Sequence, residues 1–416
     1  MRSLFEISKS GLKSAERSLS VTANNIVNAD TPGYSRQRVD KNPIGMNMTG
    51  YNTGLGVNVS TVKRLRNEMN DGQLNEKRQN MSFMQNKARV FEQLEASMAS
   101  DSGADLDLSI SSLLDTFSEL STDPQDISVR NSLISDARQL TVKFGDINRN
   151  INRTSDLILE STESSIGAVN GLLKEIQSLN ESISEAQGAG NQDNSSMDLR
   201  VKKLERLSEL IDFETQPTDN GRVELRIGGV KILDNEKAAT LKAEINDVDK
   251  VFQLRLENGK TVKPTGGQLG AEIEMYQSEI PAIKDRLDTL AATIIDEFNA
   301  IHSSGFGLND GTARNFFDVT NKTAEGIKLN QQLIDDPTNI AASSVAGEAG
   351  NGEIATQIAE LRSGQLIGGR KLIDYSVDLI STPGIKLSSL NSQIEARDSE
   401  IQMLETQQER EAGVNI

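Results

Sequence analysis

The single histidine of the chain, His302, is the residue type that most directly suggests nucleophilic catalysis. Ser303 follows it and Asp296 lies shortly before it, so a Ser–His–Asp set can be written from neighbouring residues. A lone histidine at the end of a helix, however, is more often a partly exposed polar residue than a catalytic base. We therefore expect no catalytic residue and no enzymatic activity.

Metal and cofactor chemistry has equally little support in the sequence. One histidine excludes an HExxH zinc site, and a chain without cysteine forms no disulfide and no thiolate site. No acidic cluster has the spacing of an EF-hand. Gly266, Gly267 and Gly270 lack the lysine and the preceding strand of a phosphate loop, and instead predict a turn that opens a helix. We expect no cofactor and no metal ligand.

The composition favours long helices over a deep globular core. The 416 residues leave room for two or three domains, and 36% of them are hydrophobic, but only 4% are aromatic and none is tryptophan. Thin layers of Leu, Ile, Ala and Met between parallel helices suit such a composition. The expected molecule is elongated.

The charge excludes two classes of partner. With 44 basic and 61 acidic residues the net charge is −17, so neither nucleic acid nor an anionic membrane surface is an expected partner. No apolar run approaches the ~20 residues that span a bilayer. The N-terminus is not a Sec signal peptide, because Glu6, Ser8 and Lys9 interrupt any apolar segment.

Helical periodicity dominates both ends of the chain. The segment Leu4–Ile26 predicts one helix with a single apolar stripe, and turn residues follow it up to Gly33. Gly54–Val59 alternates like a short strand. A long helix with a near-heptad seam is expected from Pro124 to Gln187, with Asp123 as its N-cap. Its seam is predicted to contain Ile134, Ala137, Phe144, Ile147, Ile151, Ile158, Ala168, Leu172, Ile176, Leu179 and Ile183.

Between Phe213 and Pro264 the period changes from helical to two. Gly228-Gly229 predicts a turn, and Asn258-Gly259 predicts a type I′ hairpin. The predicted fold class is therefore mainly α with a small β insertion, in an elongated discontinuous multidomain protein with long coiled-coil or bundle helices. The expected domains are a terminal segment at 1–64, a rod-like helical core at 65–212 plus 266–416, and an inserted β domain at 213–265.

One motif resembles the N-terminal signature shared by flagellar rod, hook and hook-associated proteins. It consists of Ala23, Asn24, Asn25, Ile26, Asn28, Thr31, Pro32, Gly33, Tyr34, Ser35, Arg36 and Gln37. Its ending, Tyr-Ser-Arg-Gln, is more similar to the hook–filament junction family than to rod or hook subunits, which usually carry Tyr-Lys there. Further segments match that family in order: Leu113–Arg130, Asp198–Ile211, Gly266–Gly270, Glu297–His302, Gly305–Asn309 and Asn315–Phe317. Nearly the whole chain thus resembles the flagellar hook-associated protein 1 family (FlgK-like).

The resemblance implies a structural subunit that joins hook to filament. It would be exported by the type III pathway without a Sec signal, act outside the cell, and polymerise helically at the hook tip. The implied partners are copies of itself in a ring, the hook protein, the second junction protein and flagellin side of the filament, and an export chaperone. The implied assembly residues are the motif above and the terminal helix stripe Leu4, Ile7, Leu12 and Leu19.

The family continues beyond a Gly-Val-Asn similar to Gly413-Val414-Asn415 into a final amphipathic helix. We therefore expect that a C-terminal helix is missing here, that it would pair with Leu4–Ile26, and that it would hold the chaperone site. Two alternatives stay open. A hook or distal-rod subunit would share the motif, and a secreted coiled-coil adhesin or translocator would share the heptads.

Overall fold

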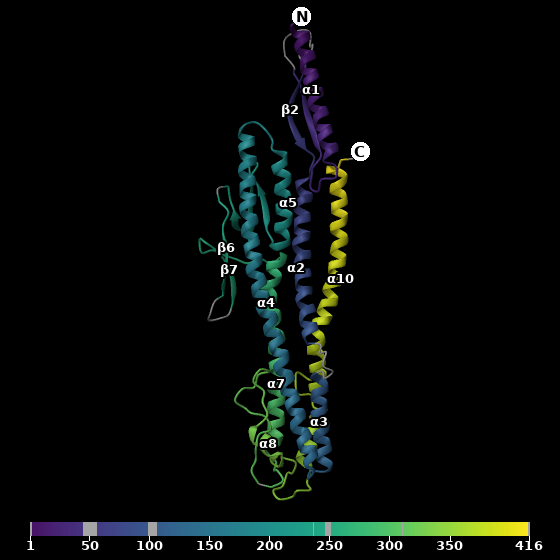
Figure 1. Ribbon diagram of the computed structural model, residues 1–416, viewed down its shortest axis with the longest axis vertical. Coiled ribbons are helices and arrows are strands. Elements are labelled where there is room, and N and C mark those ends of the chain that lie inside the picture. Colours follow the sequence, from purple (N-terminus) through teal and green to yellow (C-terminus); the bar gives the residue numbers. More distant parts are fainter. Residues whose placement is uncertain are drawn as a thin grey trace. The chain divides into compact units, whose positions relative to one another are not determined.

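The computed structural model describes residues 2–44, 56–98, 106–235, 237–245, 251–309 and 311–414 (Figure 1). The helical elements are α1 (Arg2–Val27), α2 (Glu68–Met98), α3 (Leu106–Thr122), α4 (Ile127–Gly188), α5 (Asn194–Leu210), α6 (Gly267–Glu274), the π-helical turn η1 (Met275–Glu279), α7 (Ile280–His302), α8 (Gln331–Asp335), the 3-10 turn η2 (Pro337–Asn339), α9 (Glu353–Glu360) and α10 (Leu372–Ala412). The strands are β1 (Gln37–Pro43), β2 (Val57–Arg64), β3 (Glu214–Pro217), β4 (Val223–Ile227), β5 (Val230–Leu233), β6 (Leu241–Ile245), β7 (Phe252–Leu256) and β8 (Thr261–Val262).

These elements form a mainly α fold with a small β insertion, which confirms the predicted fold class. The chain divides into two compact units, each built from separated segments. The first unit contains residues 1–86, 161–273 and 391–416, and the second contains 87–160 and 274–390. The three-domain division drawn from the sequence stays a prediction. None of the described helices is long and apolar enough to cross a membrane.

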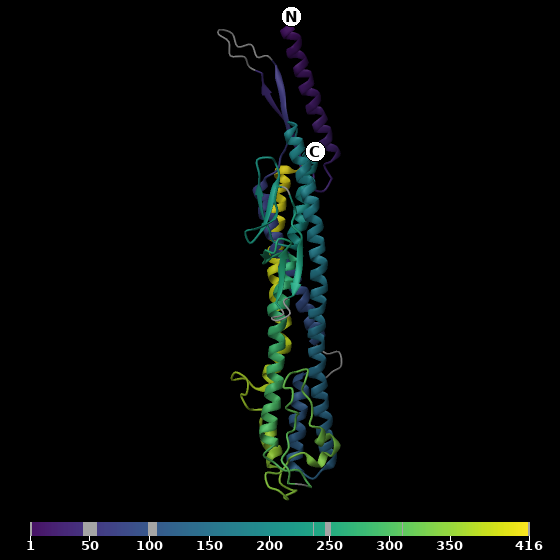
Figure 2. The same ribbon diagram turned by 90° about the vertical axis from the view of Figure 1, so that its left-hand side faces the viewer.

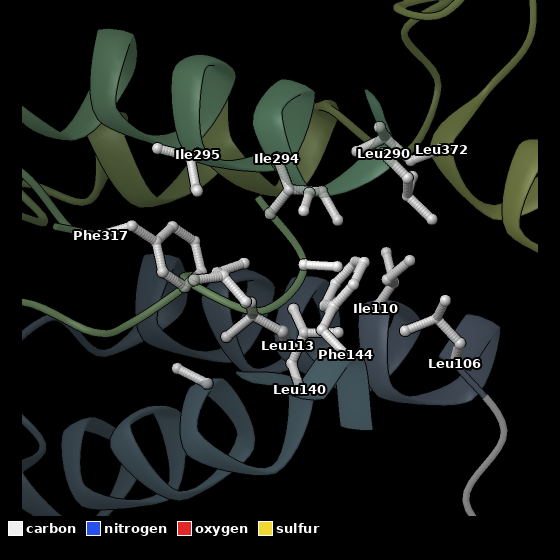
Figure 3. Packing of buried hydrophobic residues seen from close by; sticks show 14 of the residues in the cluster. Leu106, Ile110, Leu113, Leu140, Phe144, Leu290, Ile294, Ile295, Phe317 and Leu372 are labelled. Atoms are coloured by element: carbon white, nitrogen blue, oxygen red, sulfur yellow. The ribbon is translucent and has the colours of Figure 1, made fainter. Parts of the chain in front are cut away.

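The second unit has a continuous apolar core. Leu113 of α3, Phe144 of α4 and Leu290 of α7 are all fully buried and belong to the same apolar cluster as Phe317 from the loop after α7 (Figure 3). A cluster of four phenylalanines, at positions 117, 298, 316 and 317, continues this core with ring centroids 4.9–5.9 Å apart. Together with Phe91 and Phe144, six of the eleven phenylalanines of the chain thus lie in this core.

A buried arginine closes one end of this core. Arg130 of α4 is 1% exposed, and its guanidinium donates to the carbonyl oxygens of Pro124 at 2.6 Å and 3.1 Å and of Ile340 at 2.6 Å. Burial lowers the pKa of Arg130 to about 10. Pro124 lies in a turn before the helix, in which the N–H of Asp126 donates to the carbonyl of Asp123 at 3.2 Å.

The start of α4 therefore differs from the prediction. The helix begins at Ile127, and the N-cap is Asp126, whose carboxylate accepts from the backbone N–H of Ser128 and Val129. The predicted cap Asp123 and first residue Pro124 precede the helix in a turn.

The seam of α4 was predicted correctly only in part. Its first half is buried from Ile134 to Ile158, as expected, but further along three predicted members, Ala168, Leu172 and Leu179, are not buried. The buried face shifts register once, between Ile158 and Ile166, and then resumes heptad spacing, as at a stutter in a heptad repeat. In this part of the helix the buried positions include Ile166, Val169, Leu173, Ile176, Asn180 and Ile183.

The β insertion contains two three-stranded antiparallel sheets, in the orders β3-β4-β5 and β6-β7-β8. Gly228 and Gly229 both have positive φ, 52° and 79°, and connect β4 to β5 through the predicted turn. The Asn258-Gly259 turn is different from the prediction. The N–H of Gly259 donates to the carbonyl of Leu256, so Glu257 and Asn258 are the central residues and Gly259 follows them at φ 81°. The loop is thus a three-residue hairpin with a glycine bulge and not a type I′ turn.

Asparagine side chains on α4 attach these sheets to the helix, and Figures 1 and 2 show strands of the insertion beside α4. Asn180 accepts from the N–H of Val223 at 3.2 Å and donates to the carbonyl of the same residue at 2.9 Å. Asn170 does the same to Leu241, at 2.8 Å and 2.9 Å. Val223 and Leu241 are the first residues of β4 and β6, so the start of each strand is bound by an asparagine side chain of α4.

His302 also fixes loop backbone and is not partly exposed, in contrast to the expectation. The imidazole is fully buried, its Nδ1 lies 2.7 Å from the carbonyl of Arg314, and its Nε2 accepts from the N–H of Ala341 at 2.9 Å. A carbonyl only accepts, so Nδ1 carries the proton and the ring is neutral. Burial lowers the pKa of His302 to about 4.

This depressed pKa predicts an acid-sensitive fold. In the unfolded chain His302 is protonated below pH ~6.5, whereas in the native chain it stays neutral down to about pH 4. The free energy of unfolding should therefore fall as the pH falls through this window. The loss should approach about 3 kcal/mol at the lower end. Urea unfolding of the chain and of His302→Gln at pH 7, 6, 5 and 4 measures it. Equal slopes of stability against pH in both proteins would contradict the prediction.

Candidate assembly site

The predicted assembly motif lies at the end of α1 and in the turn after it. The N–H of Tyr34 donates to the carbonyl of Thr31 at 3.1 Å, and Gly33 has φ 76°. A Cβ at Gly33 would lie 2.1 Å from the Cε of Lys202 on α5. The backbone conformation therefore favours glycine, while the flexible side chain of Lys202 packs over it.

Asn25 fastens the end of α1 to the first residue of β1. Its Oδ1 accepts from the N–H of Gln37 and its Nδ2 donates to the carbonyl of Gln37, both at 2.9 Å. The phenol of Tyr34 donates to the same Oδ1 at 2.8 Å. Burial, with a smaller contribution from the charge of Asp198, raises the pKa of Tyr34, so this phenol stays a donor at neutral pH.

Ser35 is fully buried and binds a carboxylate of α5. Its hydroxyl donates to Oδ1 of Asp198 at 2.7 Å, and its backbone N–H donates to Oδ2 at 3.2 Å. The guanidinium of Arg64, at the end of β2, donates to the same carboxylate at 3.0 Å. A longer side chain at position 35 would not fit, which gives a physical reason for serine at this place of the signature.

Arg36 closes the C-terminal end of α10. Its backbone N–H donates to the carbonyl of Ala412 at 2.9 Å, and its guanidinium to that of Glu411 at 3.4 Å. The last carbonyls of a helix have no partner within the helix, and a cation there is favourable for the helix dipole. Consecutive motif residues thus bind three different helices: Ser35 binds α5, Arg36 binds α10, and Gln37 binds α1.

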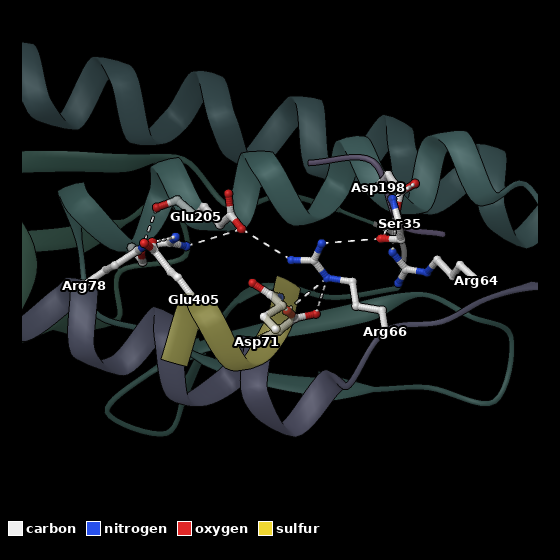
Figure 4. Close-up of polar contacts among 10 residues, drawn as sticks. Ser35, Arg64, Arg66, Asp71, Arg78, Asp198, Glu205 and Glu405 are labelled. Carbon is white, nitrogen blue, oxygen red and sulfur yellow. Dashed lines mark hydrogen bonds and ion pairs between the residues drawn. The ribbon is translucent and has the colours of Figure 1, made fainter. Parts of the chain in front are cut away.

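Ion pairs continue this contact between α2, α5 and α10 (Figure 4). Arg66 donates to Asp71 at 2.8 Å and to Glu205 of α5 at 3.4 Å, and its side chain is only 6% exposed. Arg78 of α2 binds both Glu205 at 3.3 Å and Glu405 of α10 at 2.8 Å. Because these groups are partly buried, salt screens them less than it screens surface pairs.

The terminal helix stripe is exposed in the described structure. Leu4, Leu12 and Leu19 are 69%, 65% and 72% exposed. Ile7 lies on a different face of α1, where it is partly buried near Gly56 at the start of β2. An exposed phenylalanine that the sequence analysis omitted, Phe5, extends the stripe. Phe5, Leu12, Leu19 and Ile26 recur at heptad spacing, which is typical of a helix that packs against another helix.

Other motif residues have smaller roles in the described contacts. Ala23, Asn24 and Pro32 are exposed, and Asn28 bonds within the helix end and the turn. The residues that contact the motif within the subunit were not predicted from the sequence. Asp198 falls in a segment that resembles the family, but nothing in the sequence links it to Ser35. No local pattern marks Arg64 or Arg66 either.

The fold is that of a flagellar junction protein. The solved structure of the flagellar hook junction protein FlgK from Burkholderia pseudomallei superposes with a TM-score of 0.72 at 12% identity, covering 81% of this chain and 99% of that one. Residues 91–317 match the family model of the flagellar hook-associated protein FlgK helical domain, and residues 5–34 match that of the flagella basal body rod protein. Since the first match covers more than half of the chain, the protein belongs to the flagellar hook-associated protein FlgK family.

Curated relatives agree with this family. Flagellar hook-associated protein 1 of Bacillus subtilis is 24% identical over 435 residues, which cover 93% of this chain and 86% of that protein. The Salmonella typhimurium and Escherichia coli proteins of the same name are also 24% identical, over 80% and 77% of this chain. The chain spans 64% and 60% of those two proteins, less than two thirds of their length. The resemblance inferred from the sequence is confirmed.

The contact between Ser35 and Asp198 predicts a large stability effect. Asp198→Ala leaves the buried hydroxyl and N–H of Ser35 and the guanidinium of Arg64 without their acceptor, so the free energy of unfolding should fall by roughly 3 kcal/mol. Urea unfolding measures it. Glu209→Ala, which removes only an exposed ion pair on the same helix, should change stability by less than about 1 kcal/mol. A similar small change in Asp198→Ala would show that the contact is unimportant.

Proposed function

We propose that this chain is a structural subunit that joins the flagellar hook to the filament and has no catalytic activity. Its family membership supports the role, and its relatives carry the names hook-associated protein and hook junction protein. In this proposal the subunit is exported without a Sec signal and acts outside the cell. It assembles there with copies of itself, between the hook protein and the second junction protein and flagellin side of the filament.

The observation that carries the proposal is the exposed stripe of α1. Leu12 and Leu19 are more than half exposed, while the opposite face of the same helix is tied to the β1–β2 pair through Ser10 and Asn25. Such a helix is held by its own subunit and still offers apolar side chains to another helix, either one of a neighbouring subunit or the C-terminal helix that the family resemblance implies. Helical addition of identical subunits uses heterologous contacts of this kind.

The rod-protein match at residues 5–34 favours a second candidate, a hook or distal-rod subunit, because that segment contains the shared signature. The match to the FlgK helical domain over residues 91–317 supports the junction role instead. A coiled-coil adhesin or translocator has no support from either match.

End-binding to isolated hooks tests the proposal. We expect the chain to decorate hook tips in electron micrographs, and Leu12→Asn with Leu19→Asn to lower the occupancy of tips at least about tenfold, because two apolar anchors are lost. Circular dichroism and melting should stay unchanged, since both side chains are already exposed. The matched variant Lys13→Asn with Ser20→Asn, beside the stripe on the same helix, should bind normally.

Two results would contradict this account. Absence of tip binding by the unsubstituted chain would argue against the junction role itself. Normal binding by the stripe variant would leave the role intact and would show that α1 does not provide the contact.

A further inference from the structure

A groove in the first unit separates the first turns of α2 from strand β3. Two cavities, of 470 and 580 Å3, both include Gly72, Asn75 and Thr215 in their walls and are therefore contiguous. Volumes of this size are typical of ligand pockets. All four residues of β3 are exposed, and this strand is the edge of its sheet.

The wall of the groove includes a glycine inside a helix, Gly72 of α2. A Cβ placed at Gly72 would have no atom within 4 Å, so nothing in the surrounding structure requires a glycine there. Glycine is unfavourable in a helix interior, and such a residue usually has a packing or functional reason. Here its effect is to leave the groove open.

A buried amide oxygen in the wall of the groove has no partner. Asn75 is 6% exposed, yet its Oδ1 accepts no hydrogen bond from any described residue. Arg222, in the wall of the larger cavity, likewise has a buried Nε–H without an acceptor in the described part of the chain. Both atoms are covered by their neighbours, so a ligand reaches them only when the two side chains turn toward the groove. One acceptor and one donor would then be the complements of a peptide N–H and C=O.

The rest of the molecule shows what such an asparagine binds. In four places a helix-borne asparagine binds both the N–H and the C=O of one residue outside the helices: Asn25 with Gln37, Asn170 with Leu241, Asn180 with Val223, and Asn299 with Phe317. Asn75 also lies on a helix next to extended backbone, but its acceptor is unused.

We propose that this groove binds an extended peptide segment of a partner protein. Asn75 would accept from a backbone N–H of the peptide and Arg222 would donate to a backbone carbonyl. Met69 and Leu204 in the larger cavity would surround an apolar side chain. Glu76 and Glu214, exposed carboxylates of the smaller cavity, would face a lysine or arginine of the same segment. The site does not depend on the junction role.

Selection from linear octapeptides displayed on phage, with the full chain as bait, tests the proposal. The variant Gly72→Leu fills the groove without endangering the fold, because leucine forms helices more readily than glycine. Gly171→Leu is its matched control: Gly171 lies in α4, also has open space around it, and is not in the wall of either cavity. We expect enriched peptides that combine an apolar with a basic residue. Their affinity should fall at least about tenfold in Gly72→Leu and stay unchanged in Gly171→Leu.

N-methylation of each backbone amide of an enriched peptide in turn identifies the peptide N–H that donates its hydrogen bond to Asn75. Methylation at one position should weaken binding to the unsubstituted chain but have little further effect on Asn75→Leu, because both changes remove the same hydrogen bond. No enrichment, or equal affinity for Gly72→Leu, would overturn the proposal. Concentration-dependent self-association that Gly72→Leu abolishes would also overturn it, since the occupant would then be a second copy of this chain.

Discussion

Paired hydrogen bonds between a helix-borne asparagine and one non-helical residue anchor each of the three sheets in the described part of this protein, and also the loop at Phe317. Its strands have between two and eight residues, and small sheets of this kind are marginal without further support. A side-chain amide supplies one donor and one acceptor, which match the C=O and N–H of a peptide. Each such asparagine therefore supplies the pair of hydrogen bonds that a neighbouring strand would otherwise make, at a place where a strand or a loop lies against a helix.

The same constraint organises the signature at the end of α1. Asn25 sets the position of Gln37, and the two residues before Gln37 are then placed to bind α5 and α10. Ser35 is held through the buried carboxylate of Asp198, and Arg36 through the last carbonyls of α10. The signature is thus mainly a joint within the subunit. The apolar stripe of α1 is exposed on the other side of this joint, and in the proposed assembly it would provide the contact surface.

Much of the fold follows from sequence periodicity, because helices and hairpins are local structures. The helix of Leu4–Ile26, the long helix of the middle and the two-glycine turn of the β insertion were all predicted. The errors have physical causes. Asp126 rather than Asp123 caps α4, since Asp123–Asp126 form a turn that ends directly before Ile127. The predicted α4 seam is wrong beyond Ile158 because the heptad register shifts once after that residue.

The candidate site could be predicted only in part. The motif was recognised from its resemblance to the family, but its partners could not be found, because Ser35 and Asp198 are far apart in sequence and meet only in the fold. Strand β1 was missed since its residues, Gln37–Pro43, have little of the alternation that marks a strand. The partly exposed histidine expected at position 302 is instead a buried member of the core, where it holds loop backbone.

Hydrogen exchange in the full chain with Asn170→Leu tests the asparagine contacts most directly. Asn170 binds only the backbone of Leu241 in the described structure, so the substitution removes this pair and little else. The amides of β6 and β7 should then exchange at least about tenfold faster, while those of α4 keep their protection. Asn131→Leu, an exposed asparagine on the same helix with only a local hydrogen bond, should leave both unchanged. Unaltered protection of β6 and β7 in Asn170→Leu would contradict the account.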